Sequence, residues 1–195
     1  MKNIIIIAFI TIIVIMISLG CASAIRYDGP YEGRVIDIDT GEPIEGVVVL
    51  GEWSREHITP GGAVSEYYDA RETVTDKNGE FSIPGQGLLI ASNITPMDVL
   101  IFKAGYEYIG FAPWASFKKG LLLSKKIKWE GDKAIIPLKK LTMEERRKAG
   151  TFPSTPPSEA PLDKVSLMLE EINKEAIERG LEPIDIWRGE KVWEK

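Results

Sequence analysis

The sequence predicts an all-β protein, built as a sandwich of antiparallel strands with a helical extension on its C-terminal side. Two patterns lead to this prediction: from residue 31 onward apolar and polar residues alternate, and turn-forming residues recur about every ten positions. The composition, 44% hydrophobic and 27% charged, is that of a folded globular domain. A chain of 195 residues has room for one ordinary domain with appendages.

Residues 1–24 are interpreted as a signal peptide or membrane anchor, because residues 4–19 are apolar apart from one threonine and one serine. Three interpretations remain open. In the first, Cys21 becomes the lipidated first residue of a bacterial lipoprotein. In the second, ordinary signal peptidase cuts after Ala24, and in the third, the segment is not cut and spans a bilayer. We favour lipidation of Cys21, the one cysteine of the chain, although Ser18 stands where such signals usually carry leucine. Each interpretation places the rest of the chain outside the cytoplasm.

Residues 26–140 are expected to form the sandwich. The expected strands are rich in β-branched and aromatic residues and are bounded by glycine, proline, asparagine or aspartate. In chain order they cover residues 31–37, 44–50, 71–75, 80–83 and 99–103, and a last hairpin covers 125–138. The apolar run at 47–50 predicts a strand buried on both faces, and Asn78-Gly79 is a strong hairpin signal.

Three segments of this region resemble the carboxypeptidase regulatory-like domain, a transthyretin-like sandwich. They are GRVIDIDTGEPIEGVVV at 33–49, TVTDKNGEFSIPG at 73–85 and VLIFKAGYEY at 99–108, in the order and at the spacing of that family. The resemblance implies a seven-stranded Greek-key sandwich and a folding, stability or adhesion module without catalytic residues. Two departures from the family, long loops expected at 52–70 and 85–97, are where a function specific to this chain would lie.

Aromatic residues are the candidate ligand-binding side chains. Exposed tyrosine and tryptophan rings on a sandwich can stack on a sugar ring, while the same rings can also serve to pack long loops against the core. The candidates are Trp53, Tyr67, Tyr68, Tyr106, Tyr108 and Trp114. Trp114 is the first of these that we would test.

His57, the one histidine of the chain, is the centre of any enzymatic interpretation. Together with Glu52 and Glu56 it would supply a histidine and two carboxylates to a metal ion, or it would act as the base of a serine hydrolase. No G-x-S-x-G motif accompanies it, and an exposed loop histidine is the simpler explanation, because so few ligands would have to order a free loop. We therefore expect no catalytic residue, no metal ligand and no cofactor.

The C-terminal side is interpreted as two helices joined by a linker. Thr142 and Glu145 form the T-x-x-E pattern of a capping box, which predicts a short helix within 141–150. Four prolines make 151–161 an extended linker, and 162–195 holds an amphipathic helix and a tail. The apolar stripe of that helix consists of Leu162, Val165, Leu169, Ile172 and Ala176. Either the sandwich or a partner protein covers this stripe.

The formal charge of −5 lacks the basic excess of nucleic-acid-binding proteins, so we expect no nucleic acid partner. These features predict an exported module of the bacterial cell envelope, held at the periplasmic or surface face by a lipid or an anchor. It would bind an envelope protein without catalysis. A carbohydrate-binding module that contacts a glycan is the alternative, and a hydrolase or metal site at His57 is the third possibility.

Overall fold

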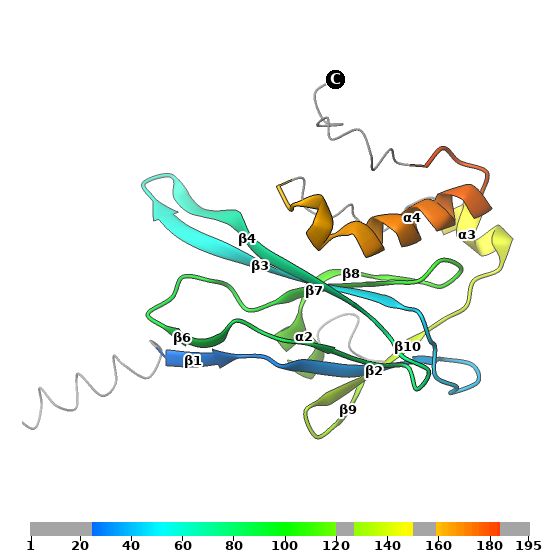
Figure 1. Ribbon diagram of the computed structural model, residues 1–195, viewed down its shortest axis with the longest axis horizontal. Helices are drawn as coiled ribbons and strands as arrows, with labels where there is room; N and C mark the ends of the chain where they lie inside the picture. The colour runs from blue at the N-terminus through cyan, green and yellow to red at the C-terminus, as the bar shows by residue number, and fades with distance from the viewer. Residues whose placement is uncertain (1–24, 120–126, 150–158, 184–195) are drawn as a thin grey trace, which may run out of the picture.

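The computed structural model describes residues 25–119, 127–149 and 159–183. These residues form ten strands in two four-stranded sheets and one two-stranded ribbon, together with helices (Figure 1). The protein is mostly β, as predicted, with more strands than the expected seven. The predicted leader with Cys21, most of the linker and the end of the tail lie outside the described residues. None of the helices in the described ranges is long and apolar enough to cross a membrane.

The first sheet is antiparallel throughout and has the strand order β4–β3–β7–β8. Its strands are β3 (Val48–Thr59), β4 (Gly62–Val74), β7 (Asp98–Phe102) and β8 (Ile109–Pro113). The prediction of burial on both faces is confirmed at 47–50, where none of the four side chains is more than 4% exposed. The strand itself begins at Val48 rather than at Ile44, and it continues well past Leu50.

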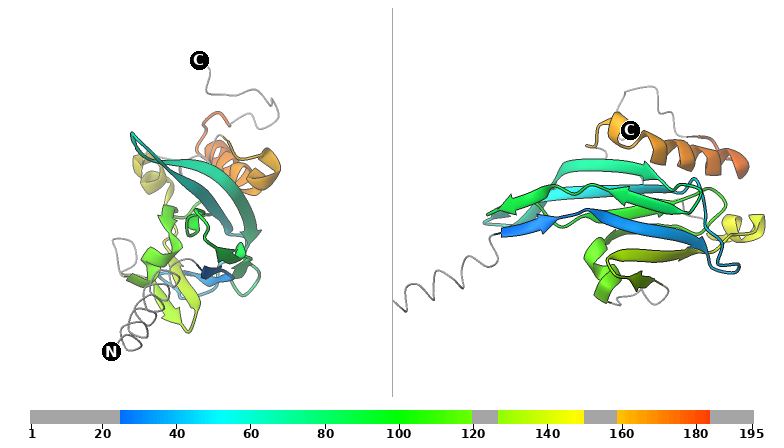
Figure 2. Two further views of the ribbon diagram at one scale, coloured as in Figure 1. Left: turned by 90° about the vertical axis from the view of Figure 1, so that its left-hand side faces the viewer. Right: turned by 60° about the horizontal axis from the view of Figure 1, so that its bottom comes forward.

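The second sheet faces the first across a shared apolar core and has the order β5–β2–β10–β9 (Figure 2). Its strands are β2 (Tyr31–Asp37), β5 (Glu80–Ile83), β9 (Lys128–Glu130) and β10 (Lys133–Leu138). The pairing of β10 with β2 is parallel, which corrects the prediction of a purely antiparallel sandwich. In β2 a Cβ on Gly33 would lie 2.5 Å from the ring of Phe81, so only glycine lets that ring pack there.

At one end of the molecule two pairs of strands extend past the core of the sandwich, and we call them together the arm (Figure 1). One part is the ribbon of β1 (Ile25–Asp28) and β6 (Gly87–Ile90), and the other is the outer half of the β3–β4 hairpin, residues 54–68. The prediction of a long loop at 52–70 is therefore wrong, because these residues continue the β3–β4 ladder of the first sheet. The loop expected at 85–97 likewise contains a strand, β6.

One helix, α4 (Ser166–Glu178), covers the outer face of the first sheet, while α2 (Trp114–Lys119) packs into the core between the sheets. The structure also has α3 (Met143–Ala149) and a short 3-10 turn (Leu162–Lys164). The capping box of α3 is confirmed: Glu145 N–H donates to Thr142 Oγ1 at 3.3 Å, and Thr142 N–H donates to Glu145 Oε2 at 2.9 Å. The stripe of α4 packs on this sheet, with Met168 and Ile172 among the most buried side chains. The sandwich therefore covers the predicted stripe from Val165 onward, whereas Leu162 lies in the 3-10 turn and is 47% exposed.

Polar contacts hold the start of α4 on β4. The carboxylate of Glu72 accepts the backbone N–H groups of Leu167 and Met168, at 3.0 and 2.7 Å. Lys164 Nζ, in the 3-10 turn before α4, lies 2.6 Å from Oδ1 of Asp69 in β4. The helix is thus attached to the sheet by charged groups as well as by its apolar face.

Candidate functional site

The two candidate tryptophans are core residues. Trp53 is fully buried, and its indole N–H donates to Asp28 at 2.8 Å. Trp114 is 7% exposed, and its ring contacts those of Tyr31 and Phe81. The expectation that both rings lie exposed for stacking on a ligand is corrected, because long-range packing between the two sheets buries them.

The four candidate tyrosines lie in three different surroundings. Tyr67 and Tyr108 are half-buried against the cluster beneath α4, and Tyr106 is half-buried against the core between the sheets. Tyr68 is exposed on the arm, where the guanidinium of Arg55 lies 4.8 Å from the centre of its ring. The structure therefore does not bring the predicted aromatic residues together into one binding site.

His57 lies on the exposed part of the arm. Its Nε2 is 2.8 Å from Oε1 of Glu66 on the facing strand. Successive side chains of a strand point to opposite faces, so Glu52 and Glu56 stand on the face away from His57. Within the described residues, no group of three or more histidine, cysteine, aspartate or glutamate side chains is placed to hold a metal ion.

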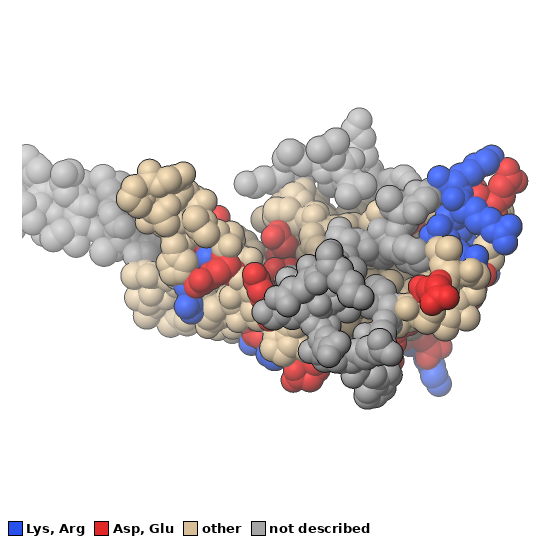
Figure 3. Space-filling view, turned by 90° about the horizontal axis from the view of Figure 1, so that it is seen from above, with Lys and Arg blue, Asp and Glu red and all other residues tan. Residues whose placement is uncertain are grey.

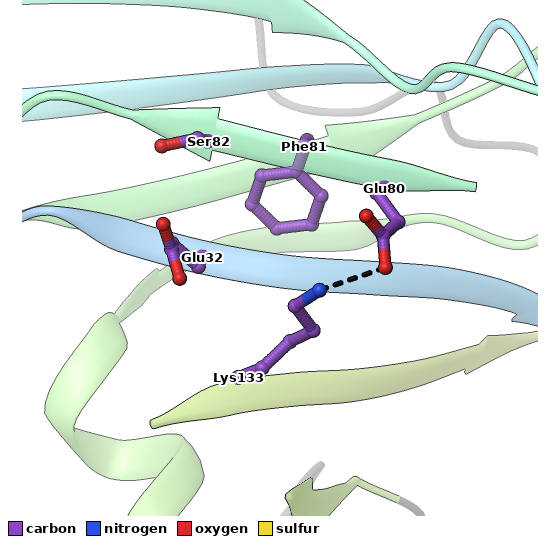
Figure 4. Close-up of a pocket in the computed structure, with 5 residues that line it drawn as sticks. All are labelled: Glu32, Glu80, Phe81, Ser82 and Lys133. Atoms are coloured by element: carbon purple, nitrogen blue, oxygen red, sulfur yellow. Dashed lines mark hydrogen bonds and ion pairs between the residues drawn. The ribbon is translucent and has the colours of Figure 1, made fainter. Parts of the chain in front are cut away.

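The second sheet carries two adjoining depressions that share Glu32, and we call them together the Glu32 groove. The smaller, about 260 Å³, is lined by Glu32, Glu80, Phe81, Ser82 and Lys133 (Figure 4). The larger, about 550 Å³, is lined by Tyr27, Gly29, Pro30, Tyr31, Glu32, Trp114, Ala115 and Asp132. The groove therefore runs across the sheet and ends beside the ribbon.

The strand register explains why these side chains meet. Glu32 in β2 stands directly opposite Ser82 in β5 and opposite Lys133 in β10. The three side chains thus form a row across three strands on the outward face. Lys133 Nζ lies 2.7 Å from Oε1 of Glu80, which raises the pKa of the lysine through this hydrogen bond (Figure 4).

The groove offers carboxylates and aromatic rings to a ligand. Glu32, Glu80 and Asp132 line it against the single ammonium group of Lys133, so its charge is acidic. Tyr27 is 72% exposed, while the hydroxyl of Tyr31 donates to Asp28 at 2.7 Å. The lining residues include no histidine or cysteine.

Two further acids face each other on the outer side of the first sheet. Glu52 in β3 and Asp98 in β7 are directly opposite in the register. Burial raises the pKa of Glu52 to about 7, and the carboxylates of Asp98 and Glu159 add to the shift. Burial also raises the pKa of Asp98. We therefore expect this pair to make the stability of the sheet sensitive to pH.

Sequence reasoning missed the groove. Its polar residues alternate with core residues as in any half-exposed strand, so nothing local distinguishes Glu32 or Lys133. No family model, curated protein or solved structure matches this chain.

Proposed function

We propose that this chain is an exported, membrane-held binding module without catalytic function, whose Glu32 groove takes a segment of a partner protein of the bacterial cell envelope. The observation that carries the proposal is the difference between the two outer faces of the sandwich. Helix α4 covers the first sheet, whereas Glu32, Glu80 and Ser82 of the second sheet stand exposed around a groove. Membrane attachment is inferred from the leader and Cys21.

The charge of the groove indicates what kind of segment fits it. Three carboxylates and one ammonium group attract basic side chains and repel acidic ones. Lys133 is already paired with Glu80, so the acidic character is greatest around Glu32. We therefore expect a polar segment that carries lysine or arginine.

A glycan is the second candidate ligand. The larger depression is lined by three aromatic residues, Tyr27, Tyr31 and Trp114, and Tyr27 is the most exposed of them. An exposed phenol ring next to carboxylates is a surface on which a sugar ring can stack and form hydrogen bonds. Titration with cell-wall polysaccharides would detect this ligand, and Tyr27→Ala would remove the binding.

The sandwich is best understood as a variant of the carboxypeptidase regulatory-like domain. The segments that resemble that family supply β2, the turn before β5, and β7. The ribbon and the outer half of the β3–β4 hairpin are then additions, and the eight strands of the two sheets are one more than the seven of that family. The family resemblance supports a role in binding or adhesion and supplies no catalytic residue.

Site-specific photo-crosslinking in bacteria tests the protein ligand. A photoreactive amino acid replaces Ser82 in the full-length chain, and the matched control replaces Ser65, an exposed serine on the arm. We expect one discrete adduct from position 82 and none from position 65, and Glu32→Lys should reduce the adduct several-fold. An adduct that forms equally in the Glu32→Lys background would show that the groove is not the binding surface.

A further inference from the structure

The ribbon presents an apolar face to solvent. The register pairs Ile25 with Ile90 and Tyr27 with Leu88, so these four side chains share one face of the two strands. They are 56%, 64%, 72% and 61% exposed, respectively. Four large side chains that are more than half exposed and directly adjacent make a patch of the kind that marks an interaction surface.

The two charged residues of the ribbon, Arg26 and Asp28, form hydrogen bonds with other parts of the chain. Arg26 donates to the carbonyl oxygens of Ile94 and Thr95, the latter at 3.0 Å. Asp28 is buried and accepts a hydrogen bond from the indole of Trp53 at 2.8 Å. The exposed face of the ribbon is therefore uncharged, as a surface that enters an apolar medium must be.

Exposed apolar side chains gather at this end of the molecule. Among the described residues, seven large hydrophobic side chains are more than half exposed, and six of them lie on the arm. The six are Ile25, Tyr27, Ile58, Val64, Leu88 and Ile90. Viewed from above, the tip of the arm is uncharged with a few acidic and basic side chains next to it, whereas lysine and arginine gather at the opposite end (Figure 3).

The residues that precede the ribbon indicate that a lipid bilayer covers this face. Cys21 precedes Ile25 by four residues, and four residues span at most about 14 Å in any conformation. A lipid on Cys21, or a leader that remains in the bilayer, therefore keeps the ribbon at the membrane surface. Tyrosine beside aliphatic side chains is also the composition that favours the boundary between headgroups and acyl chains.

We propose that the face formed by Ile25, Tyr27, Leu88 and Ile90 lies on the lipid bilayer that holds the leader. The contact fixes the orientation of the sandwich, because it adds a second attachment to the tether at Cys21. The inference rests on the proposed membrane attachment and goes beyond it, since a tether alone would leave the domain free to tumble. A second copy of the chain, or a glycan stacked on Tyr27, is the competing occupant of this face.

Spin labels on the full-length chain test this docking. The protein is purified in detergent from bacterial membranes and reconstituted in vesicles of phosphatidylethanolamine and phosphatidylglycerol at low protein content. Leu88→Cys carries the label on the ribbon, and Ile177→Cys on α4, 63% exposed, is the matched control. Wild-type chain treated with the same label serves as the control for any labelling of Cys21. Ile90→Cys repeats the test at a second position of the ribbon in case Leu88→Cys perturbs the fold.

We expect the ratio of collisions with oxygen to collisions with a water-soluble nickel complex to be several-fold higher at position 88 than at position 177. Equal, water-like ratios at both positions in chains that float with the vesicles would overturn docking and leave membrane attachment intact. Chains that do not float with the vesicles would overturn both. Spin–spin broadening at position 88 would assign the face to a second copy and overturn the lipid contact.

Discussion

Arg146 on α3 and Glu175 on α4 form a buried, two-pronged ion pair. Arg146 Nε lies 2.9 Å from Glu175 Oε1, a second guanidinium nitrogen contacts Oε2, and each side chain is 8% exposed. The same carboxylate accepts the backbone N–H of Gly105 at 2.9 Å, in the connection between β7 and β8. One residue pair thus ties both C-terminal helices to the first sheet.

Removing one partner of this pair should be strongly destabilising. Glu175→Gln removes the buried carboxylate and leaves Arg146 with the more exposed carboxylate of Glu178, which lies 2.7 Å away. We expect a loss of about 1.5–3 kcal/mol in the free energy of unfolding, because hydrogen bonds to a charged group are lost in a buried site. Urea denaturation measures this loss. Lys148→Ala breaks an exposed pair with Glu144 and should cost less than about 0.5 kcal/mol. Similar losses in both variants would mean that the Arg146–Glu175 pair is not buried.

Glu72 replaces the missing N-cap of α4. Val165 stands at the cap position and has no side-chain acceptor, so the Glu72 carboxylate accepts the first N–H groups from outside the helix. We expect Glu72→Ala to cost about 1 kcal/mol and to speed hydrogen exchange in the first turn of α4. Glu170→Ala removes an exposed acid from the same helix and should leave that exchange unchanged. Unchanged exchange in Glu72→Ala would refute the capping role.

The Glu52–Asp98 pair should make the protein less stable as the pH rises. The pKa of Glu52 is raised to about 7 in the folded state, mainly by burial, so between about pH 4.5 and 7 the folded state holds a proton that the unfolded state has lost. The free energy of unfolding should therefore fall across this range.

Glu52→Gln removes the part of this dependence that comes from Glu52, because the amide stays neutral at every pH. The variant should gain stability relative to the wild type at about pH 8 and little at about pH 5, as measured by the urea midpoints. Glu56→Gln, which removes an exposed carboxylate of the same strand, should keep the dependence. If the gain of Glu52→Gln were the same at both pH values, Glu52 would not titrate in this range.

Asp28 should hold the ribbon to the core. Its carboxylate accepts hydrogen bonds from Trp53 Nε1, the Tyr31 hydroxyl and the Gln86 N–H, at 2.8, 2.7 and 2.9 Å. We expect Asp28→Ala to cost about 1–3 kcal/mol for each buried donor left unpaired. Hydrogen exchange of β1 and β6 should rise with it. An unfolding midpoint that stays at the wild-type value would contradict this role.

The sequence was sufficient to predict the parts of the fold that depend on local chemistry. The Asp76–Gly79 turn, strands β2 and β5, and the capping box at Thr142 and Glu145 depend on neighbouring residues, and the structure confirms them. The parallel pairing of β10 with β2 joins residues about a hundred positions apart, and no local pattern indicates it.

The arm and the groove were missed for physical reasons as well. Both faces of the outer β3–β4 hairpin are exposed, so its sequence lacks the apolar alternation that would predict a strand. The row formed by Glu32, Ser82 and Lys133 exists only after the strands are in register. Burial of Trp53 and Trp114 depends on contacts between the two sheets.

Mass spectrometry of the mature N-terminus tests the central claim, that this module works at a membrane surface, most directly. The account predicts a chain that begins at Cys21 with a diacylglyceryl group on its sulfur. A chain that begins at Met1 would keep the ribbon at the bilayer through the leader instead. A mature protein that begins at an unmodified Ile25 would contradict the account, because nothing would then hold the domain at a lipid surface.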